Sequence, residues 1–168
     1  MSIRLADEKD VPAITGVYIR SWYSTYRGLL PESLLNMITP EGAEKTFRES
    51  FRSEGYSYFV LLAEDGSGAL MGYLDGGKDR ESDRKDLAEV YGMYLPEPFQ
   101  KQGWGRELFR EAFLKFRDQG FLEARTWVLQ QGLARGFYEK MGGRLDPETR
   151  RVGNGKDWMT LVSYRWNL

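Results

Sequence analysis

The hydrophobic and polar positions of this chain follow two spacings, one typical of helices and one typical of strands. In the first part of the chain an apolar side chain recurs every three or four residues, at Val11, Ile14, Tyr18 and Trp22. The same spacing returns after Pro40, between Gly105 and Gly120, and over residues 134–141. This period predicts four helices, each with one apolar face.

Continuous or alternating apolar runs separate these helices and predict strands. The expected strands cover residues 3–6, 56–64, 69–75, 88–95, 124–129 and 158–166, with one further strand possible in the tail. Strands and helices in this order predict an α/β fold, with a mixed, mostly antiparallel central sheet of six or seven strands and helices on both faces. No linker or repeat is visible, so residues 1–168 are expected to form a single domain.

A charged segment, KDRESDRKD, interrupts the apolar pattern at residues 78–86, between two expected strands. Charge runs of this kind are typical of a solvated face of a protein. We therefore expect a loop that is exposed to water and has no further role.

Composition and charge narrow the chemistry that the chain can perform. The 24 basic and 25 acidic residues nearly cancel and form no long block of one sign, so nucleic acid is not an expected partner. The chain has no cysteine and no histidine, which leaves carboxylates, tyrosine, lysine or water for proton transfer and makes a metal site unexpected. No signal peptide or apolar run of roughly 20 residues is visible, so we expect a cytoplasmic protein without a membrane partner.

The segment QKQGWGRELF, residues 100–109, places two glycines at the start of a predicted helix. Glycine costs a helix roughly 1 kcal/mol relative to alanine, so a bare backbone is favoured here for another reason. A helix N-terminus presents free N–H groups and the positive end of the helix dipole, and Lys101 and Arg106 add positive charge. These features predict an anion site at Gly103 and Gly105, with a tight turn that binds no ligand as the alternative.

The segment AEVYGMYLPEPFQKQGWGRELF, followed by WVLQQGLARGFYEKMGGR, resembles the two core motifs of the GNAT superfamily of acyl-CoA N-acetyltransferases. About 55 residues carry the resemblance, and the order of helices and strands extends it to essentially the whole chain. The resemblance implies a GNAT-like fold and transfer of an acetyl group from acetyl-CoA to a primary amine. Since no cysteine can carry the acyl group, we expect direct transfer in a ternary complex. A non-catalytic acyl-CoA-binding or sensing module is the alternative.

The resemblance assigns one set of residues to acetyl-CoA, the expected co-substrate. Met93 and Leu95 match strand positions whose main chain pairs with the pantetheine arm. Gln131 stands where an asparagine that contacts the cofactor is usual, so this contact departs from the family pattern. The loop whose backbone amides hold the pyrophosphate in the family matches Gln100, Lys101, Gln102, Gly103, Trp104, Gly105 and Arg106.

Further residues match positions that act on protons or on the acceptor. Glu89 matches an acidic position used as a base or water-holder, and Tyr138 matches the tyrosine that protonates the departing thiolate. A polar strand end and a core tyrosine are the plainer interpretations of these two residues. Trp22, Tyr26 and Arg27 lie where the family's helical pair borders the acceptor site, although clustered aromatics also serve as core or lid packing.

The acceptor is the part of the function that the sequence determines least. A nearly neutral chain has no strong field to select a highly charged partner. The family accepts both small amines and protein N-termini, and a small amine is slightly preferred here over a peptide. The protein is expected to act as a monomer or a homodimer.

Overall fold

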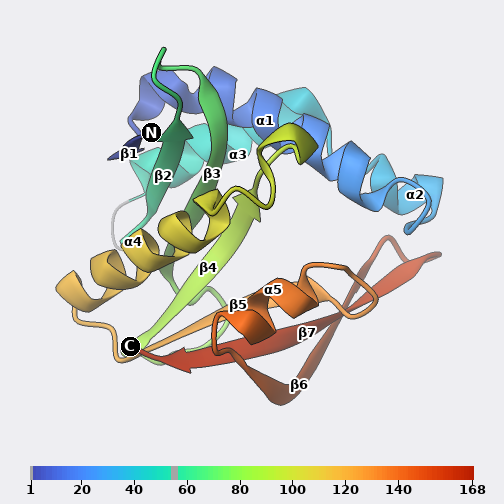
Figure 1. Ribbon diagram of the computed structural model, residues 1–168. Helices are drawn as coiled ribbons and strands as arrows, with labels where there is room; N and C mark the ends of the chain where they lie inside the picture. Colours follow the sequence, from blue (N-terminus) through green and yellow to red (C-terminus); the bar gives the residue numbers. More distant parts are fainter. Residues whose placement is uncertain (1, 54–56) are drawn as a thin grey trace.

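A computed structural model describes residues 2–53 and 57–168 (Figure 1). The helices are α1 (Val11–Tyr26), α2 (Glu32–Leu35), α3 (Pro40–Arg52), α4 (Trp104–Asp118) and α5 (Arg135–Lys140), with 3₁₀ turns η1 (Glu8–Asp10) and η2 (Glu97–Phe99). The strands are β1 (Ser2–Leu5), β2 (Phe59–Glu64), β3 (Leu70–Lys78), β4 (Leu87–Tyr94), β5 (Glu123–Leu129), β6 (Arg144–Gly153) and β7 (Trp158–Asn167). The predicted helices and strands are confirmed with small differences at their ends. Residue 56, where one strand was expected to begin, lies outside the described residues.

The strands form one seven-stranded sheet in the order β1-β2-β3-β4-β5-β7-β6. Neighbouring strands run antiparallel except for β4 and β5, which are parallel. A parallel pair needs a crossover connection, and α4 supplies it between β4 and β5. The mixed, mostly antiparallel sheet predicted from the sequence is therefore confirmed.

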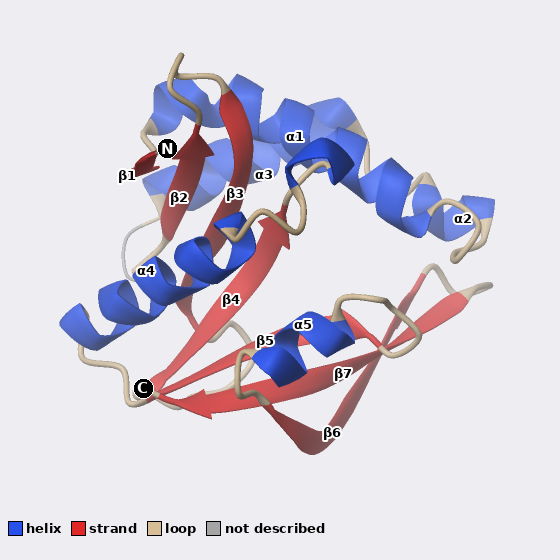
Figure 2. Ribbon diagram, in the orientation of Figure 1, coloured by secondary structure: helices blue, strands red, loops and turns tan. Residues whose placement is uncertain are grey.

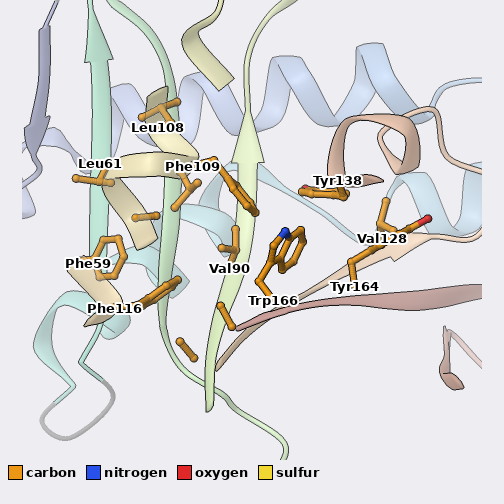
Figure 3. Packing of buried hydrophobic residues seen from close by; sticks show 14 of the residues in the cluster. Phe59, Leu61, Val90, Leu108, Phe109, Phe116, Val128, Tyr138, Tyr164 and Trp166 are labelled. Atoms are coloured by element: carbon orange, nitrogen blue, oxygen red, sulfur yellow. The ribbon is translucent and has the colours of Figure 1, made fainter. Parts of the chain in front are cut away.

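Helices cover both faces of this sheet, as expected (Figure 2). On one face α4 and α5 enclose a core that includes Phe109, Phe116, Tyr138 and Trp166 (Figure 3). On the other face α1 and α3 enclose a second core that includes Val11, Ile14, Phe47 and Tyr73. The two cores fix the sheet from both sides and hold the neighbouring strands β3 and β4 at its centre.

The parallel strands β4 and β5 separate along their length, as Figure 1 shows. They pair only from Leu87 with Glu123 to Val90 with Thr126, although both strands continue beyond these residues. The Thr126 hydroxyl donates a hydrogen bond of 2.9 Å to the Val90 carbonyl and joins the strands at the last pair. Beyond that point the facing edges of β4 and β5 have no strand partner within the described ranges. We call this opening the β4–β5 wedge.

Candidate active site

The loop from Gln100 to Arg106 lies at the end of β4 and leads into α4. Its two glutamine side chains turn back on the chain, because Gln100 Nε2 donates to the Leu95 carbonyl at 2.8 Å and Gln102 Nε2 donates to the Pro98 carbonyl at 2.7 Å. The backbone N–H groups of residues 101–106 have no hydrogen-bond acceptor in the part of the chain that the structure describes. The loop therefore presents a row of free donors at a helix N-terminus, which is the arrangement that binds a phosphate group.

The structure explains the two glycines of this loop in different ways. Gly103 caps α4 with φ of 92°, a left-handed conformation, and a Cβ there would meet no described atom within 4 Å. Its bare backbone thus leaves open space at the N-terminus of α4, and its contact with an anion stays a prediction. Gly105 is instead buried, and a Cβ there would come within 3.3 Å of Phe137 and 3.4 Å of Leu95 and Met93. The expected role of Gly105 in leaving room for an anion is replaced by close packing of α4 on β4 and α5.

The other residues assigned to the cofactor lie around the wedge. Met93 is on the part of β4 that has left β5, and Leu95 follows directly after that strand. Gln131 is exposed in the turn after β5. Trp104 is buried with 4% of its surface exposed, so its indole belongs to the core and only its main chain is available to a ligand. Lys101 and Arg106 are exposed beside the free amides and bring positive charge to the anion site.

Tyr138 extends from α5 toward β4, as Figure 3 shows. Its ring packs against Phe109 and Trp166 with centroids 6.0 and 6.1 Å away. Burial raises the pKa of Tyr138 to about 12, with Tyr26 and the Thr126 hydroxyl close to the phenol. A phenol with so high a pKa keeps its proton at neutral pH, so Tyr138 is present in the protonated form that a proton donor needs.

The predicted acceptor-side residues do not all reach this tyrosine. Tyr26, at the end of α1, lies near both Tyr138 and Tyr94. Trp22 stacks on Tyr26 with ring centroids 4.5 Å apart and is itself buried. Arg27 is exposed, and its guanidinium lies 5.9 Å from the ring of Tyr23. The structure thus brings Tyr26 to the wedge, while Trp22 supports it and Arg27 lies at the surface.

Glu89 is fully buried on β4, with 1% of its surface exposed. Arg80 holds both of its carboxylate oxygens: Nη2 donates to Oε1 at 2.7 Å and Nε donates to Oε2 at 3.2 Å. The backbone N–H of Arg80 also donates to Oε2 at 3.2 Å. Glu89 pairs in register with Gly77 and Arg125, in the part of β4 that is bonded on both edges. The carboxylate predicted as a base is therefore already an ion-paired acceptor of three hydrogen bonds.

A second buried carboxylate, Asp75 on β3, has no described hydrogen bond to its side chain of the kind that holds Glu89. Asp75 faces Gly92 in the register of β3 and β4, and a Cβ on Gly92 would stand 3.2 Å from Asp75 Oδ1. Asp75 also lines a cavity of about 380 Å³ beneath α3, together with Phe47, Tyr58, Arg80 and Tyr91. Burial raises the pKa of Asp75 to about 7, with Arg80 opposing and Glu89 adding to this shift.

The charged segment at residues 78–86 is not simply a solvated loop, so that expectation was wrong. Asp79 is buried, and its carboxylate accepts bonds from Arg125 Nε at 2.5 Å and Nη2 at 3.0 Å. Arg80 lies over the Tyr91 ring at 3.9 Å and reaches Glu89 behind it. Sequence reasoning missed these residues because the run as a whole is polar. For the buried carboxylates on this face the available signal was Asp75, a single acidic residue within the otherwise largely apolar strand β3.

Comparison with known proteins agrees with this architecture. The Acetyltransferase (GNAT) family matches residues 7–143. The chain is 29% identical over 139 residues to the uncharacterized N-acetyltransferase YuaI of Bacillus subtilis, covering 83% of this chain and 78% of that protein. The PaiA N-acetyltransferase of Thermoplasma acidophilum, solved in complex with coenzyme A, has a TM-score of 0.76 at 21% identity, covering 99% and 100% of the two chains. YncA of Salmonella typhimurium, solved with its cofactor acetyl-CoA, has a TM-score of 0.75 at 22% identity, covering 99% and 93%.

The family match and the related sequence therefore define an acyltransferase of the N-acetyltransferase class. The chain belongs to the GNAT acetyltransferase family, because the family match spans more than half of its length. Within residues 2–53 and 57–168, no helix has the length and apolar character that a membrane crossing requires. In the same ranges no group of three or more acidic side chains is placed to hold a metal ion. Cellular location and oligomeric state stay predictions.

Proposed function

We propose that this protein, as a single domain over residues 1–168, transfers an acetyl group directly from acetyl-CoA to a primary amine within a ternary complex. One observation carries the proposal: a row of free backbone amides at the N-terminus of α4 opens onto an unpaired strand edge of β4. The amides suit a pyrophosphate, and the strand edge at Met93 suits the amide groups of a pantetheine arm. Both features fit a coenzyme A thioester whose reactive end lies between β4 and β5.

Direct transfer follows from the side chains that are present. The chain has no cysteine, so no acyl-cysteine intermediate can form. Tyr138 is buried beside the wedge and keeps its proton at neutral pH, so we assign it the donation of a proton to the departing sulfur. The proton of the acceptor ammonium then goes to a carboxylate on the β3–β4 face, where the sequence predicted Glu89, either directly or through water.

A small amine is our preferred acceptor, with a peptide N-terminus as the second choice. The cavity beneath α3 holds about 380 Å³ and is lined by aromatic rings, by the carboxylates of Asp75 and Glu49 and by one cation, Arg80. Because carboxylates outnumber cations in this lining, the cavity suits a compact cationic group. The test is release of free coenzyme A from acetyl-CoA over a panel of small amines and short peptides. Because the protein has no thiol of its own, a thiol reagent reports the product alone.

Two results would contradict the proposal. Calorimetric binding of coenzyme A without thiol release for any amine or peptide would indicate a non-catalytic binding or sensing module. Recovery of radiolabelled acetyl-protein from acetyl-CoA without acceptor, competent to acetylate an amine added later, would exclude direct transfer. Tyr138→Phe is expected to lower turnover while the affinity for coenzyme A changes little, because only the proton donor is removed.

The anion site itself can be tested with matched glycine variants. Gly103 and Gly120 both have φ near 90°, and a Cβ on either would meet nothing within 4 Å, but Gly120 lies at the opposite end of α4. Gly103→Asp and Gly120→Asp should therefore impose similar backbone strain. Only Gly103→Asp should lower the affinity for coenzyme A, by about tenfold or 1.4 kcal/mol, because its side chain and charge occupy the place of the pyrophosphate. Equal affinities would remove the argument from the free amides.

A further inference from the structure

Two buried carboxylates lie on the face of the sheet covered by α1 and α3, and their surroundings differ. Glu89 is held at both oxygens by Arg80 and lies in the part of β4 that is still paired with β5. Asp75 is 8% exposed, lines the cavity beneath α3, and lies opposite Gly92, beyond the last β4–β5 pair. An ion-paired carboxylate is a poor proton acceptor, because protonation would break its charge-assisted bonds.

We propose that Asp75, rather than Glu89, accepts the proton of the acceptor amine, and that Glu89 positions Arg80 and adds negative charge behind Asp75. The proposal rests on the proposed acetyl transfer and names the base for it. In this assignment the base projects from β3, while Glu89 on β4 serves as a positioning residue.

The geometry places Asp75 opposite the stretch of β4 that borders the wedge. Its carboxylate lies over Gly92, where the missing Cβ leaves room for it, and Gly92 is on the stretch of β4 that borders the wedge. Tyr94, two residues further along β4, lies near both Asp75 and Tyr138. The candidate base and the candidate acid thus approach the same end of β4 from opposite faces of the sheet, as a transfer between an amine and a thioester requires.

The neighbours of Asp75 explain how a carboxylate can act as a base at neutral pH. Its burial raises the pKa of Asp75 to about 7, the charge of Arg80 opposes this rise, and Glu89 reinforces it. The Tyr58 hydroxyl faces Asp75 and is buried without a hydrogen bond of normal geometry among the described residues. The titratable groups that surround Asp75 are Tyr18 from α1, Glu49 from α3, Tyr58 before β2, Tyr73 from β3, Arg80 from the following loop, and Glu89, Tyr91 and Tyr94 from β4.

The protons of the reaction balance with these two residues. Asp75 takes one proton from the ammonium nitrogen, and the neutral nitrogen forms the new C–N bond as the C–S bond breaks. The sulfur gains a proton from Tyr138, and the second proton of the nitrogen restores the phenol. One proton per turnover then leaves Asp75 for solvent through the cavity that Asp75 lines.

The test compares full-length wild type, Asp75→Asn and Glu89→Gln with saturating acetyl-CoA and the fastest amine, from about pH 5.5 to 9.5. In the wild type, kcat should rise with pH and level off near the pKa of the base. Asp75→Asn should lose roughly a hundredfold in kcat at pH 7, and its log kcat should keep rising with pH, because only free amine then reacts. Its affinity for acetyl-CoA should change by less than about threefold.

Glu89→Gln tests the positioning role, since it removes one buried charge from the same face and keeps the base. Its plateau kcat should fall far less than that of Asp75→Asn, and the pH at which its kcat levels off should be lower, because a negative charge near Asp75 is lost. A Glu89→Gln loss larger than that of Asp75→Asn would overturn the proposal. So would an Asp75→Asn variant that keeps kcat and only raises the KM for the amine, which would make Asp75 a binding residue.

Folding and function are separated by two further measurements. Thermal melting and coenzyme A binding establish that Asp75→Asn and Glu89→Gln are folded before their kinetics are interpreted. If Asp75→Asn does not fold, a carbon-13 NMR titration of the Asp75 carboxyl in wild type decides: a midpoint matching the rise in kcat supports the proposal, and a midpoint near that of an ordinary aspartate overturns it. Wild type that releases no thiol with any acceptor would contradict the proposed acetyl transfer itself, whereas normal wild-type turnover with an active Asp75→Asn contradicts the base alone.

Discussion

Two buried aspartates four residues apart, Asp75 on β3 and Asp79 in the loop that follows, differ in their hydrogen-bond partners and in the direction of their pKa shifts. Asp79 is 2% exposed and accepts hydrogen bonds from Arg125 and from the backbone N–H groups of Glu81 and Ser82. Burial acts to raise the pKa of Asp79, but the bonds from Ser82 and Arg125 outweigh it and hold the pKa below its usual value. Asp75 is almost as buried, and its pKa rises to about 7.

The difference between the two aspartates lies in their partners and not in their depth. Arg125 is buried with Asp79 and points both relevant nitrogens at it. The cation nearest to Asp75 is Arg80, but Arg80 directs its guanidinium to Glu89 and is about half exposed at its side chain. A buried carboxylate with a dedicated cation stabilises the fold, whereas one without a cation is left to exchange protons. The same residue type thus has a structural role at 79 and a candidate chemical role at 75.

The largest expected effect is a loss of stability when Asp79, the aspartate with the structural role, is replaced. Asp79→Asn leaves the Arg125 guanidinium buried with Glu148 as its remaining close partner, and should lower the free energy of unfolding by about 3 to 5 kcal/mol. The matched control is Asp86→Asn, whose carboxylate and whose partner Arg84 are both only partly buried, and it should change stability little. Denaturant unfolding at pH 7 measures both variants.

The loss from Asp79→Asn should depend on pH with a definite sign. Because the pKa of folded Asp79 lies below its ordinary 3.8, its contribution is fully present above that pH and fades as the pH falls toward the folded value. The difference between variant and wild type should therefore shrink in acid. A constant difference down to low pH would show that the lost stability is not electrostatic.

Asp75→Asn should have the opposite effect on stability. The unfolded side chain ionises above 3.8, but the folded one ionises only above about 7, so the folded protein binds more protons between these values and wild-type stability falls as pH rises through them. The variant escapes this loss and should be more stable than wild type by roughly 1 to 4 kcal/mol above pH 7, with almost no gain near pH 4. Unfolding measured at several pH values checks this. A gain that does not vary with pH would show that the pKa of Asp75 is not raised.

Sequence reasoning succeeded where a local pattern determines the structure. The three- and four-residue spacing located α1, α3 and α4, and the free amides of the loop follow from its glycines and the helix that begins there. It left β6 undetermined, because that edge strand is largely polar, contains Pro147 and shifts register between Leu145 and Thr149. An edge strand forms because it pairs with a neighbouring strand, and a local sequence pattern does not reveal that pairing.

The candidate base could not be identified from the sequence for a related reason. Glu89 lies in a sequence motif that resembles a family motif. Asp75 lies outside that motif, on β3, which pairs with the strand β4 that carries Glu89. Which of the two carboxylates is neutralised depends on the direction of the Arg80 side chain, which the sequence shows only as one charge in a charged run. The pairing of Arg80 with Glu89 is therefore a finding that only the three-dimensional structure supplies.

The smallest expected effect is also the sharpest test of why Asp75 differs from Asp79. Arg80 lowers the pKa of Asp75 and Glu89 raises it, so Arg80→Gln and Glu89→Gln should move the Asp75 midpoint in opposite directions. Arg80→Gln should raise the Asp75 midpoint, because two buried carboxylates then lie close together without a cation. The first proton taken up is then shared by the two carboxylates. Glu89→Gln should lower the midpoint, because Arg80 then has Asp75 as its nearest carboxylate.

Each shift should be less than about one pH unit, because the Arg80 side chain is half exposed and its charge is screened. The folded pKa of Asp75 is read from the pH at which the stability gain of Asp75→Asn levels off in each background. Arg84→Gln is the control, since Arg84 pairs with Asp86 and Glu123 and should leave the midpoint in place. Shifts in the same direction for Arg80→Gln and Glu89→Gln would mean that the ion pair acts on Asp75 through the packing of the cavity, because a purely electrostatic effect must change sign with the charge removed.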